Sequence, residues 1–538
     1  MLAHGSAYPH RPRMAIGRKG GGRQNRIARR TAPEAEVNPC PPGQTGGRYR
    51  PLSDADVQAI YGTALRILAD LGMGDVPPAL AEAATAMGAT FQNERLFFPQ
   101  SLVEDVIAQA PRRFTFHGRD PNRSFEVGGD QVYFGTGGAA VQTLDLETGL
   151  YRPSTLRDLY DFTRLQDRLQ NISWYTRCCV ATDVPDNLDL DLNTAYAMLA
   201  GTTKPTGMSF FIGDHVDPVV DMFDMALGGE GRFAKTPFCK AHISPIISPL
   251  KYGEDAVDVT QAAIRRGLII NSITGAQAGA TAPATPAGFL AQTLAETLAA
   301  LMMVYAFAPG WPMIFGNWPF VLDLRTGAFV GSGGETAVMN AASAQLANWL
   351  GLPSGVAACM ADAKAVDAQM GAEKAMTALA TGLAGGNMIY ESAGMMASLL
   401  GVSFEAFVLD NEMIANTARA IRGIEVSEET LGFEAIQTAI TGEGHFLGGT
   451  HTMAAMQRDY FYPALANRDS PQMWAEGGAP DAWAVAGQKA RQILAEHHPD
   501  YLSAQADRAI RGRFKILLPE RAGQTSDHQD DQTLSHAG

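Results

Sequence analysis

The fold is decided by a stretch that opens with Leu268-Ile269-Ile270-Asn271-Ser272-Ile273-Thr274 and closes with Pro312-Met313-Ile314-Phe315-Gly316-Asn317. Both segments are short, apolar and rich in β-forming residues. Between them, leucines recur at helical spacing and share one face, at Leu290, Leu294, Leu298 and Leu301. The sequence therefore predicts a strand, a helix and a second strand in this order.

The same alternation of strand and helix extends in both directions from this stretch. Eight such strands are predicted, at Ile172–Ala181, Pro205–Ile212, Phe238–Ile246, Leu268–Thr274, Pro312–Asn317, Gly355–Asp362, Asn387–Glu391 and Phe407–Asn411. Eight alternations are typical of an α/β fold of the (β/α)8 TIM-type barrel class. In such barrels the chemistry lies at the carboxyl ends of the strands.

The rest of the chain divides around this barrel. We expect a disordered basic tail over residues 1–50, an N-terminal helical and β-rich unit over 51–168 and the barrel over 169–425. A C-terminal helical region follows over 426–518, and a flexible tail over 519–538. Ser53 is a candidate helix cap where order is expected to begin, near Leu52.

Composition narrows the class of protein. The chain has 538 residues, 46% hydrophobic, with a mean hydropathy of −0.07, and its apolar runs are too short for a membrane span. Residues 1–50 carry ten Arg and Lys against Glu34 and Glu36, a formal +8, which leaves −22 on the remainder of a chain of net charge −14. An acidic body argues against nucleic acid as a ligand. Five cysteines, with no secretory signal, favour a reducing, cytoplasmic setting.

Polar residues at the expected strand ends are the candidate site. We expect Glu391, Tyr390 and Asp362 to be catalytic, because a carboxylate placed after an apolar strand is costly unless it meets a partner or a cation. Asp362 has an alternative role as a helix cap. Several aromatic and polar side chains are expected to bind the substrate, and aromatic faces among them suit a quaternary ammonium ion: His242, Asn317, Trp318, Trp174 and Phe211.

Metal ligation has little support in the sequence. Cys239 and His242 fall on opposite faces of their strand, and no second Cys/His pair has suitable spacing, so no metal site is predicted. His445 and His451 lie in a glycine-rich loop. We expect them to bind a substrate carboxylate or, alternatively, to pin that loop by hydrogen bonds.

An ordered set of motifs resembles the trimethylamine:corrinoid methyltransferase family over roughly residues 50–515. The motifs are Asp323-Leu324-Arg325-Thr326-Gly327, Asp362-Ala363-Lys364-Ala365-Val366-Asp367-Ala368-Gln369, Gly371-x-Glu373-Lys374, Leu409-Asp410-Asn411-Glu412, Arg422-Gly423-Ile424-Glu425-Val426, Gly444-His445-Phe446-Leu447-Gly448 and Thr450-His451-Thr452. The resemblance implies a (β/α)8 barrel and an enzyme that moves a methyl group from a methylated amine to the Co(I) of a separate corrinoid protein. It implies no tightly bound cofactor.

Two departures from the family bear on the substrate. The founding members carry pyrrolysine, which this chain lacks; its position falls, in our interpretation, near Asp362–Asp367. Many relatives end the seventh strand in a His-Gly-Ala-Gly-like run, where this chain has Tyr390-Glu391-Ser392-Ala393-Gly394. The resemblance thus points to the non-pyrrolysine, glycine betaine methyltransferase-like branch, because a quaternary amine leaves as a neutral tertiary amine without electrophilic capture.

The sequence is also compatible with other functions. Trimethylamine is the alternative substrate, folate is an alternative methyl acceptor, and a barrel that only binds betaine is the non-enzymatic alternative. The expected partners are the cognate corrinoid protein and a small methylated amine, with neither nucleic acid nor membrane, and a homo-oligomer is left open.

Overall fold

The computed structural model describes residues 38–520, so most of both predicted tails lies outside the described chain. The described residues fall into two compact units. Among the described residues, one unit is Ala435–Tyr462 with residues 38–39, and the other, the body, is Cys40–Glu434 with residues 463–520.

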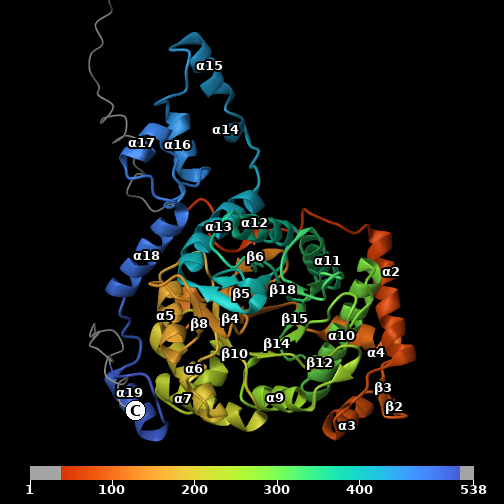
Figure 1. Cartoon of the computed structure of the whole chain (residues 1–538). Coiled ribbons are helices and arrows are strands. Elements are labelled where there is room, and N and C mark those ends of the chain that lie inside the picture. The colour runs from red at the N-terminus through yellow and green to blue at the C-terminus, as the bar shows by residue number, and fades with distance from the viewer. Residues whose placement is uncertain (1–37, 521–538) are drawn as a thin grey trace, which may run out of the picture. The chain divides into compact units, whose positions relative to one another are not determined.

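A nine-stranded sheet forms the centre of the body (Figure 1). Its strands, in spatial order, are β1 (Gln44–Thr45), β6 (Gln131–Phe134), β19 (Met388–Tyr390), β18 (Ser354–Ala357), β15 (Met313–Asn317), β14 (Ile269–Thr274), β11 (Cys239–Ile243), β10 (Thr206–Met208) and β9 (Tyr175–Thr176). Every pairing from β6 to β9 is parallel, and β1 pairs antiparallel with β6. The class is therefore α/β with a parallel sheet, as predicted.

The sheet is curled, so that β6 and β9, which are far apart in the order of its strands, come together. A parallel bridge joins Gly135, just after β6, to Trp174, just before β9. Ser173 donates a backbone hydrogen bond to Phe134 at 2.8 Å beside this bridge. Gly135 is needed there because a side chain would meet the Trp174 indole at 2.3 Å. Two segments about 40 residues apart in sequence thus close up against each other.

The eighth predicted strand is wrong. Phe407–Asn411 lies inside helix α13 (Phe404–Arg422), whose start is capped by the Ser403 side chain. The eighth parallel strand is instead β6, from the predicted N-terminal unit. A short apolar run fits a buried strand and a buried helix equally well, and here Phe404, Phe407 and Val408 recur at helical spacing. Order also begins earlier than Leu52, since β1 is formed at Gln44–Thr45.

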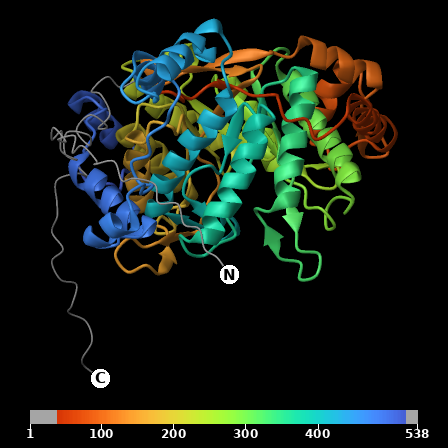
Figure 2. The ribbon, with the colours of Figure 1, turned by 90° about the horizontal axis from the view of Figure 1, so that it is seen from above.

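Helices alternate with the strands and surround the sheet (Figures 1 and 2). They are α6 (Asn187–Gly201), α7 (Val216–Ala226), α8 (Arg232–Lys235), α9 (Glu254–Arg265), α10 (Pro286–Phe307), α11 (Gly334–Leu350), α12 (Ala368–Leu383) and α13. Helix α10 is long and apolar enough to span a membrane, but 83% of its apolar window is buried inside the structure. It is accordingly placed as a core helix.

The N-terminal elements of the body are helices and short strands. They are α2 (Asp54–Arg66), a π-helical turn (Ile67–Leu71), α3 (Pro78–Ala86), β2 (Thr90–Gln92), β3 (Arg95–Phe97), α4 (Gln100–Gln109), β4 (Arg113–Phe116), β5 (Phe125–Gly128), β7 (Gln142–Leu144), β8 (Tyr151–Pro153) and α5 (Leu156–Asp167). Ser53 caps α2 in a capping box with Asp56, which confirms the predicted helix start.

Short hairpins follow several of the parallel strands. They are β12 (Ile246–Ile247) with β13 (Lys251–Tyr252), β16 (Val321–Leu322) with β17 (Phe329–Val330), and β20 (Met395–Met396) with β21 (Gly401–Ser403). In Figure 2 the green β16–β17 hairpin projects at the lower edge.

The C-terminal helices are α14 (Glu428–Leu431), α15 (Phe433–Thr441), α16 (Thr450–Arg458), α17 (Pro471–Glu476), α18 (Ala482–Glu496) and α19 (Ala504–Arg513).

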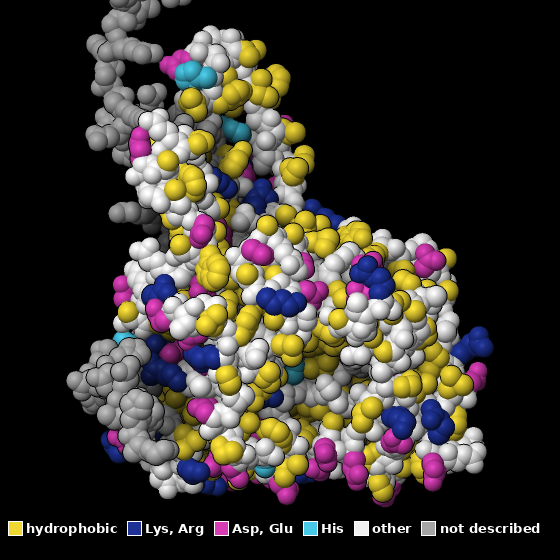
Figure 3. Space-filling model, in the orientation of Figure 1, with side chains coloured by type: hydrophobic (Ala, Val, Ile, Leu, Met, Phe, Trp, Pro, Cys, Tyr) yellow, Lys and Arg dark blue, Asp and Glu magenta, His cyan; other side chains and the backbone are white. Residues whose placement is uncertain are grey.

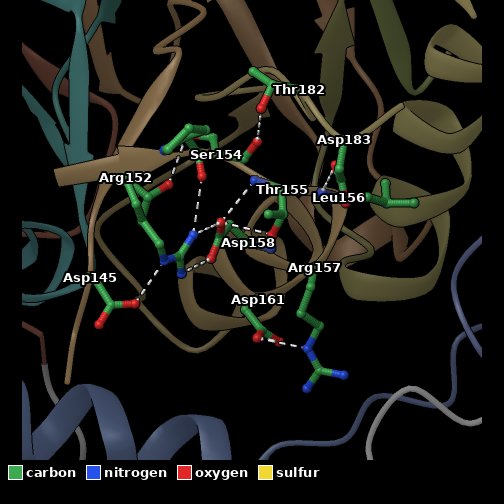
Figure 4. Close-up of polar contacts among 12 residues, drawn as sticks. Asp145, Arg152, Ser154, Thr155, Leu156, Arg157, Asp158, Asp161, Thr182 and Asp183 are labelled. Carbon is green, nitrogen blue, oxygen red and sulfur yellow. Dashed lines mark hydrogen bonds and ion pairs between the residues drawn. The ribbon is translucent and has the colours of Figure 1, made fainter. Parts of the chain in front are cut away.

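An ionic network ties the β7–β8 hairpin to α5 (Figure 4). Arg152 donates to Asp145 at 2.8 Å and, through two nitrogens, to Asp158 at 2.6 and 2.8 Å. Asp158 also forms the capping box of α5 with Thr155. This carboxylate therefore joins the strand to the start of the helix.

A second network joins the C-terminal segment of the body to the end of α5. Asp167, at the end of α5, accepts hydrogen bonds from Thr202 at 2.7 Å, His497 at 2.9 Å and Tyr501 at 2.7 Å, and pairs with Arg123. Burial alone raises the pKa of Asp167, but these hydrogen bonds and the Arg123 charge outweigh it and hold the pKa well below its ordinary value.

Loss of the Asp167 charge should destabilise the body. We expect D167N to lower the free energy of unfolding at neutral pH by about 3–5 kcal/mol, because Arg123 is left without its buried partner. Denaturant unfolding measures this, with E147Q as control, since the Glu147–Arg491 pair is exposed and worth roughly 0–1 kcal/mol. Because the folded pKa is depressed, the contribution is present above the ordinary Asp pKa and is lost as pH falls through the folded value. Equal stabilities of the two variants would contradict the anchoring role.

Candidate functional site

Four aromatic rings gather at Tyr390, the last residue of β19. Tyr390, at the end of β19, lies at their centre, with ring centroids 5.1 Å from Trp318, 5.2 Å from Trp174 and 5.7 Å from His242. Tyr390, Trp174 and Trp318 are buried, and His242 is half-buried. In Figure 3 the face of the body is hollowed near its middle, over the curled sheet, and hydrophobic side chains border the hollow. We name the four residues Tyr390, Trp318, Trp174 and His242 the aromatic cluster.

Glu391 follows Tyr390 directly and has an unusual backbone. Its φ is +61°, in the left-handed region that residues other than glycine rarely adopt. The side chain is fully buried, and neither carboxylate oxygen accepts a hydrogen bond from any residue in 38–520. A buried carboxylate without a partner is costly in free energy. Protonation of the carboxylate, or a cation beside it, reduces this cost.

A glycine-rich loop encloses the Glu391 carboxylate. A side chain at Gly137 would meet one carboxylate oxygen at 2.7 Å, and one at Gly138 would meet the other at 2.7 Å. Ser392 donates its backbone N–H to Gly135 at 3.0 Å and so ties the loop to the end of β19. The sequence Gly135-Thr136-Gly137-Gly138 thus leaves the space that Glu391 fills.

Burial governs the protonation of the site. It raises the pKa of Glu391 to about 8, against the lowering effect of Lys374 and Lys240. Burial likewise lowers the pKa of Lys240 to about 7 and that of His242 well below its ordinary value, with Lys240 adding to the effect on His242. His242 is therefore a neutral imidazole, and its Nδ1 lies 2.8 Å from the Asn271 amide nitrogen.

A buried ion pair supports the loops that carry the site. Lys374 on α12 and Asp410 on α13 are both about 1% exposed, and their charged atoms lie 2.9 Å apart. Lys374 also donates to the carbonyl of Cys359 at 2.7 Å, and Asp410 accepts the backbone N–H of Gly394 at 2.8 Å. The pair therefore fixes the loop after β18 to the loop after β19.

Some of the residues expected in the site lie elsewhere. Asp362 is five residues beyond the end of β18 and accepts hydrogen bonds from Gly331 at 2.8 Å and Ser398 at 2.7 Å, while Asp367 caps α12. Asn317 pairs with Thr274 in register, and strand alternation places it on the face of β15 opposite the aromatic cluster.

Three more expected site residues are exposed or belong to the other unit. Phe211 is 42% exposed in the loop after β10. His445 and His451 lie in the 435–462 unit, where His445 is 3.2 Å from Glu443 and His451 stands near the start of α16. Of the ten predicted residues, the structure therefore brings together Tyr390, Glu391, His242, Trp318 and Trp174.

Sequence reasoning missed the two buried lysines of the site. Lys240 stands inside an otherwise apolar strand, two residues before His242 and so on the same face, and this alternation was a usable signal. Lys374 belongs to the motif Gly371-x-Glu373-Lys374, but the sequence does not indicate that it forms an ion pair. That pair joins α12 to α13. Within residues 38–520, no group of three or more His, Cys, Asp or Glu is placed to hold a metal ion.

Comparison with known proteins assigns the family. The family model described as trimethylamine methyltransferase (MTTB) matches residues 19–515. The chain belongs to the trimethylamine methyltransferase family. This confirms the resemblance found in the sequence.

Individual members of the trimethylamine methyltransferase family are similar along most of their length. The chain is 29% identical to the glycine betaine methyltransferase of Desulfitobacterium hafniense strain Y51, over 86% of this chain and 96% of that protein. It is 30% identical to trimethylamine methyltransferases of D. hafniense strain DCB-2 (86% and 92% covered) and of Methanosarcina barkeri (85% and 95%). A solved structure, the M. barkeri monomethylamine methyltransferase, matches 83% of this chain and 94% of that one, with 13% identity and a TM-score of 0.44.

The protonation of Glu391 can be measured directly. With its pKa raised to about 8, Glu391 should be largely a neutral carboxylic acid at neutral pH and should ionise as pH rises through about 8. Infrared difference spectra of the wild type minus E391Q should contain a carboxylic acid C=O band that is lost over this range. Subtraction of E391Q removes the signal of Asp410, whose pKa is also raised by burial. A difference spectrum showing only carboxylate at neutral pH would contradict the burial argument.

Proposed function

We propose that this protein transfers a methyl group from a quaternary methylated amine, of the glycine betaine type, to the Co(I) of a corrinoid protein. The observation that carries the substrate class is Glu391, a buried carboxylate with no hydrogen-bond donor, beside the aromatic cluster. Aromatic faces attract an alkylated ammonium ion and a nearby carboxylate adds Coulombic attraction, whereas neither group favours a neutral or anionic methyl donor. Family membership supports the methyl transfer itself.

The fold we propose for this activity is a closed (β/α)8 barrel. The parallel bridge between Gly135 and Trp174 supports it, because it completes a ring of eight parallel strands from β6 through β9. The aromatic cluster then lies at the end of the barrel where such folds carry their chemistry. The proposed domains remain those of the sequence analysis, except that β6 joins the barrel and the described chain is ordered from residue 38.

Methyl transfer from a quaternary amine requires little acid–base catalysis from the protein. In the transfer, the bond between the methyl carbon and nitrogen breaks, its electron pair stays on nitrogen, and the carbon becomes bonded to the cobalt of the acceptor. A quaternary nitrogen thereby leaves as a neutral amine, and no proton moves. The side chains hold the cation with one methyl directed outward, and most of the rate enhancement comes from this orientation.

The methyl acceptor is a second substrate on a partner protein, and the rim of the body supports such a partner. Loops that follow the parallel strands expose large apolar side chains, 42–65% exposed, at Val141, Phe211, Ile212, Ile247, Leu324 and Leu400. Apolar residues gathered around the hollow of the site mark a protein interaction surface. We propose that the corrinoid protein docks there, and that both proteins are cytoplasmic.

Removal of the Glu391 charge should abolish most of the activity. Above about pH 8, where Glu391 is ionised, we expect E391Q to lower kcat/KM for the quaternary amine by about 100-fold, because the substrate cation then enters a buried site without a counter-charge. The assay follows methyl-Co(III) formation spectroscopically, with a Co(I) corrinoid protein as acceptor. Full activity in E391Q would contradict the proposal. A variant that binds the amine but transfers no methyl group would exclude the binding-only alternative.

Trp318 offers a second test with a matched control. W318L should lower kcat/KM by about 3- to 30-fold, the value of one cation–π contact. The control is W349L, because Trp349 on α11 is 46% exposed and packs on Tyr61, away from the aromatic cluster. The assay should include glycine betaine and trimethylamine in parallel. Turnover of trimethylamine alone would replace the betaine-type substrate by the alternative named in the sequence analysis.

A further inference from the structure

Three consecutive residues between β20 and β21 have a left-handed backbone. The φ angles of Ala397, Ser398 and Leu399 are +50°, +55° and +71°, and we name these residues the left-handed turn. Residues with a side chain adopt this conformation rarely and then singly, because Cβ lies too close to the following carbonyl oxygen. A run of three without a glycine therefore persists only where its surroundings fix it, and strain of this kind is concentrated at functional sites.

The carboxylate of Asp362 holds the left-handed turn from a neighbouring loop. Its Oδ1 accepts a hydrogen bond from the Ser398 hydroxyl at 2.7 Å and another from the backbone N–H of Gly331 at 2.8 Å. Gly331 follows β17, Asp362 lies in the loop after β18, and Ser398 lies in the loop after β19. One oxygen atom therefore joins three separate loops, and its removal would release two contacts at once.

Backbone hydrogen bonds align the left-handed turn with the segment that carries Asp362. The N–H groups of Ala397 and Ser398 both donate at 3.0 Å to carbonyls of residues 361–363. Two N–H groups of residues 361–363 donate in turn to the Glu373 carboxylate on α12, at 2.8 and 3.2 Å. The segment is thus anchored on a helix, and the turn is anchored on the segment.

The left-handed turn leads into an exposed apolar side chain. Leu400 follows the turn directly and is 59% exposed, while its backbone carbonyl accepts the N–H of Gln142 at 3.1 Å. Gln142 on β7 pairs in parallel register with Gly401 on β21, so Leu400 lies beside Val141, which is 46% exposed. Two apolar side chains are therefore exposed on a backbone that is fixed, which suits a contact with another protein.

Leu400 belongs to the same loop as the candidate site. Tyr390 ends β19 and Glu391 follows it, and the chain then passes through β20 and the left-handed turn to Leu400. Within the fully described stretch 391–403, Leu400 is the one large hydrophobic side chain that is exposed. The cobalt of the acceptor has to reach a methyl group held at the aromatic cluster, so the protein that carries the corrinoid has to contact the loops around that cluster.

We propose that Asp362 is a positioning residue for the methyl acceptor: its carboxylate holds the left-handed turn and thereby presents Leu400, with Val141 beside it, to the corrinoid protein. This inference rests on the proposed function. Asp362 acts through the loop and not on the transferred methyl group. Its role depends on an oxygen that accepts two hydrogen bonds, and not on the negative charge.

Removal of the Asp362 oxygens should separate docking from chemistry. In D362A the left-handed turn loses its side-chain acceptor, so KM for the corrinoid protein should rise by about 10-fold, with kcat changed by less than about 2-fold. D362N keeps an Oδ1 that can accept from both donors, and it should restore the wild-type KM. Rescue by D362N distinguishes the proposed role from one that requires the charge.

Leu400 offers an independent test with a matched control. L400D places a charge in the proposed contact and leaves the hydrogen bonds of Asp362 in place, so it should also raise KM for the corrinoid protein by about 10-fold or more. The control is L71D, because Leu71 ends the π-helical turn of the N-terminal elements and is 54% exposed, much like Leu400. L71D should keep the wild-type KM.

The experiment follows methyl-Co(III) formation from glycine betaine by the full-length protein with two kinds of acceptor. One is drawn from a panel of purified Co(I) corrinoid proteins, and the other is free cob(I)alamin, which needs no protein contact. The ratio of kcat/KM for the corrinoid protein to that for free cob(I)alamin should fall by about 10-fold in D362A and L400D. Circular dichroism and thermal unfolding check folding. If D362A does not fold, S398A removes one of the same hydrogen bonds and should have a smaller effect in the same direction.

The outcomes distinguish the two proposals. A wild type that methylates neither acceptor from any methylated amine would overturn the proposed function. Wild-type activity with free cob(I)alamin alone, or an unchanged KM for the corrinoid protein in folded D362A or S398A, would overturn the role of Asp362. An equal loss with both acceptors, or a D362N as impaired as D362A, would also overturn it. A loss confined to the corrinoid protein, repeated in L400D, absent in L71D and rescued by D362N, would establish it.

Discussion

The uncompensated burial of the Glu391 carboxylate is the constraint on which the rest of the site depends. Bulk water would solvate this group fully, whereas here no residue within 38–520 donates a hydrogen bond to it. Such a group persists only where the surrounding structure determines its position. The left-handed backbone at Glu391, the two glycines against its oxygens and the buried Lys374–Asp410 pair behind the loops all serve this purpose.

The arrangement of charges around Glu391 also supports the proposal that the site binds a cation. Lys240 and Lys374 could each have neutralised Glu391 by a direct contact. Instead, Lys374 is bonded to Asp410, and Lys240 donates to Thr176 with its ammonium 4.7 Å from the centre of the Tyr390 ring. Neither lysine donates a hydrogen bond to the Glu391 carboxylate, and the groups beside it are aromatic rings, whose faces attract alkylated ammonium ions.

Much of this could be predicted from the sequence, and the reasons for the failures are physical. Seven of the eight parallel strands were predicted because buried parallel strands are continuous apolar runs between helical stretches. The eighth was assigned to the wrong segment, since Phe407–Asn411 reads as a strand locally and β6 is identified only by its pairing with β19, more than 250 residues away. Within the site, residues that end or precede a strand, such as Tyr390, Glu391 and Trp174, were accessible to this reasoning. Asp362 was misplaced because β18 ends at Ala357, five residues before the predicted strand end. Asn317 was misplaced although the end of β15 was correct, because neighbouring residues of a strand lie on opposite faces. Lys240 required knowledge of the register between three strands.

The pairing of β6 with β19 has a consequence for how the chain is made. During synthesis, β6 emerges early and stays an unpaired edge until the last strand of the sheet has been added. Contacts between segments so distant in sequence form late and slow the folding of a domain. An exposed strand edge is meanwhile a template for pairing with other chains. The short antiparallel strand β1, which is synthesised well before β6, pairs with the opposite edge of β6 and leaves the edge that β19 later occupies uncovered. The edge of β6 that receives β19 is therefore open to pairing with other chains until β19 itself has been synthesised.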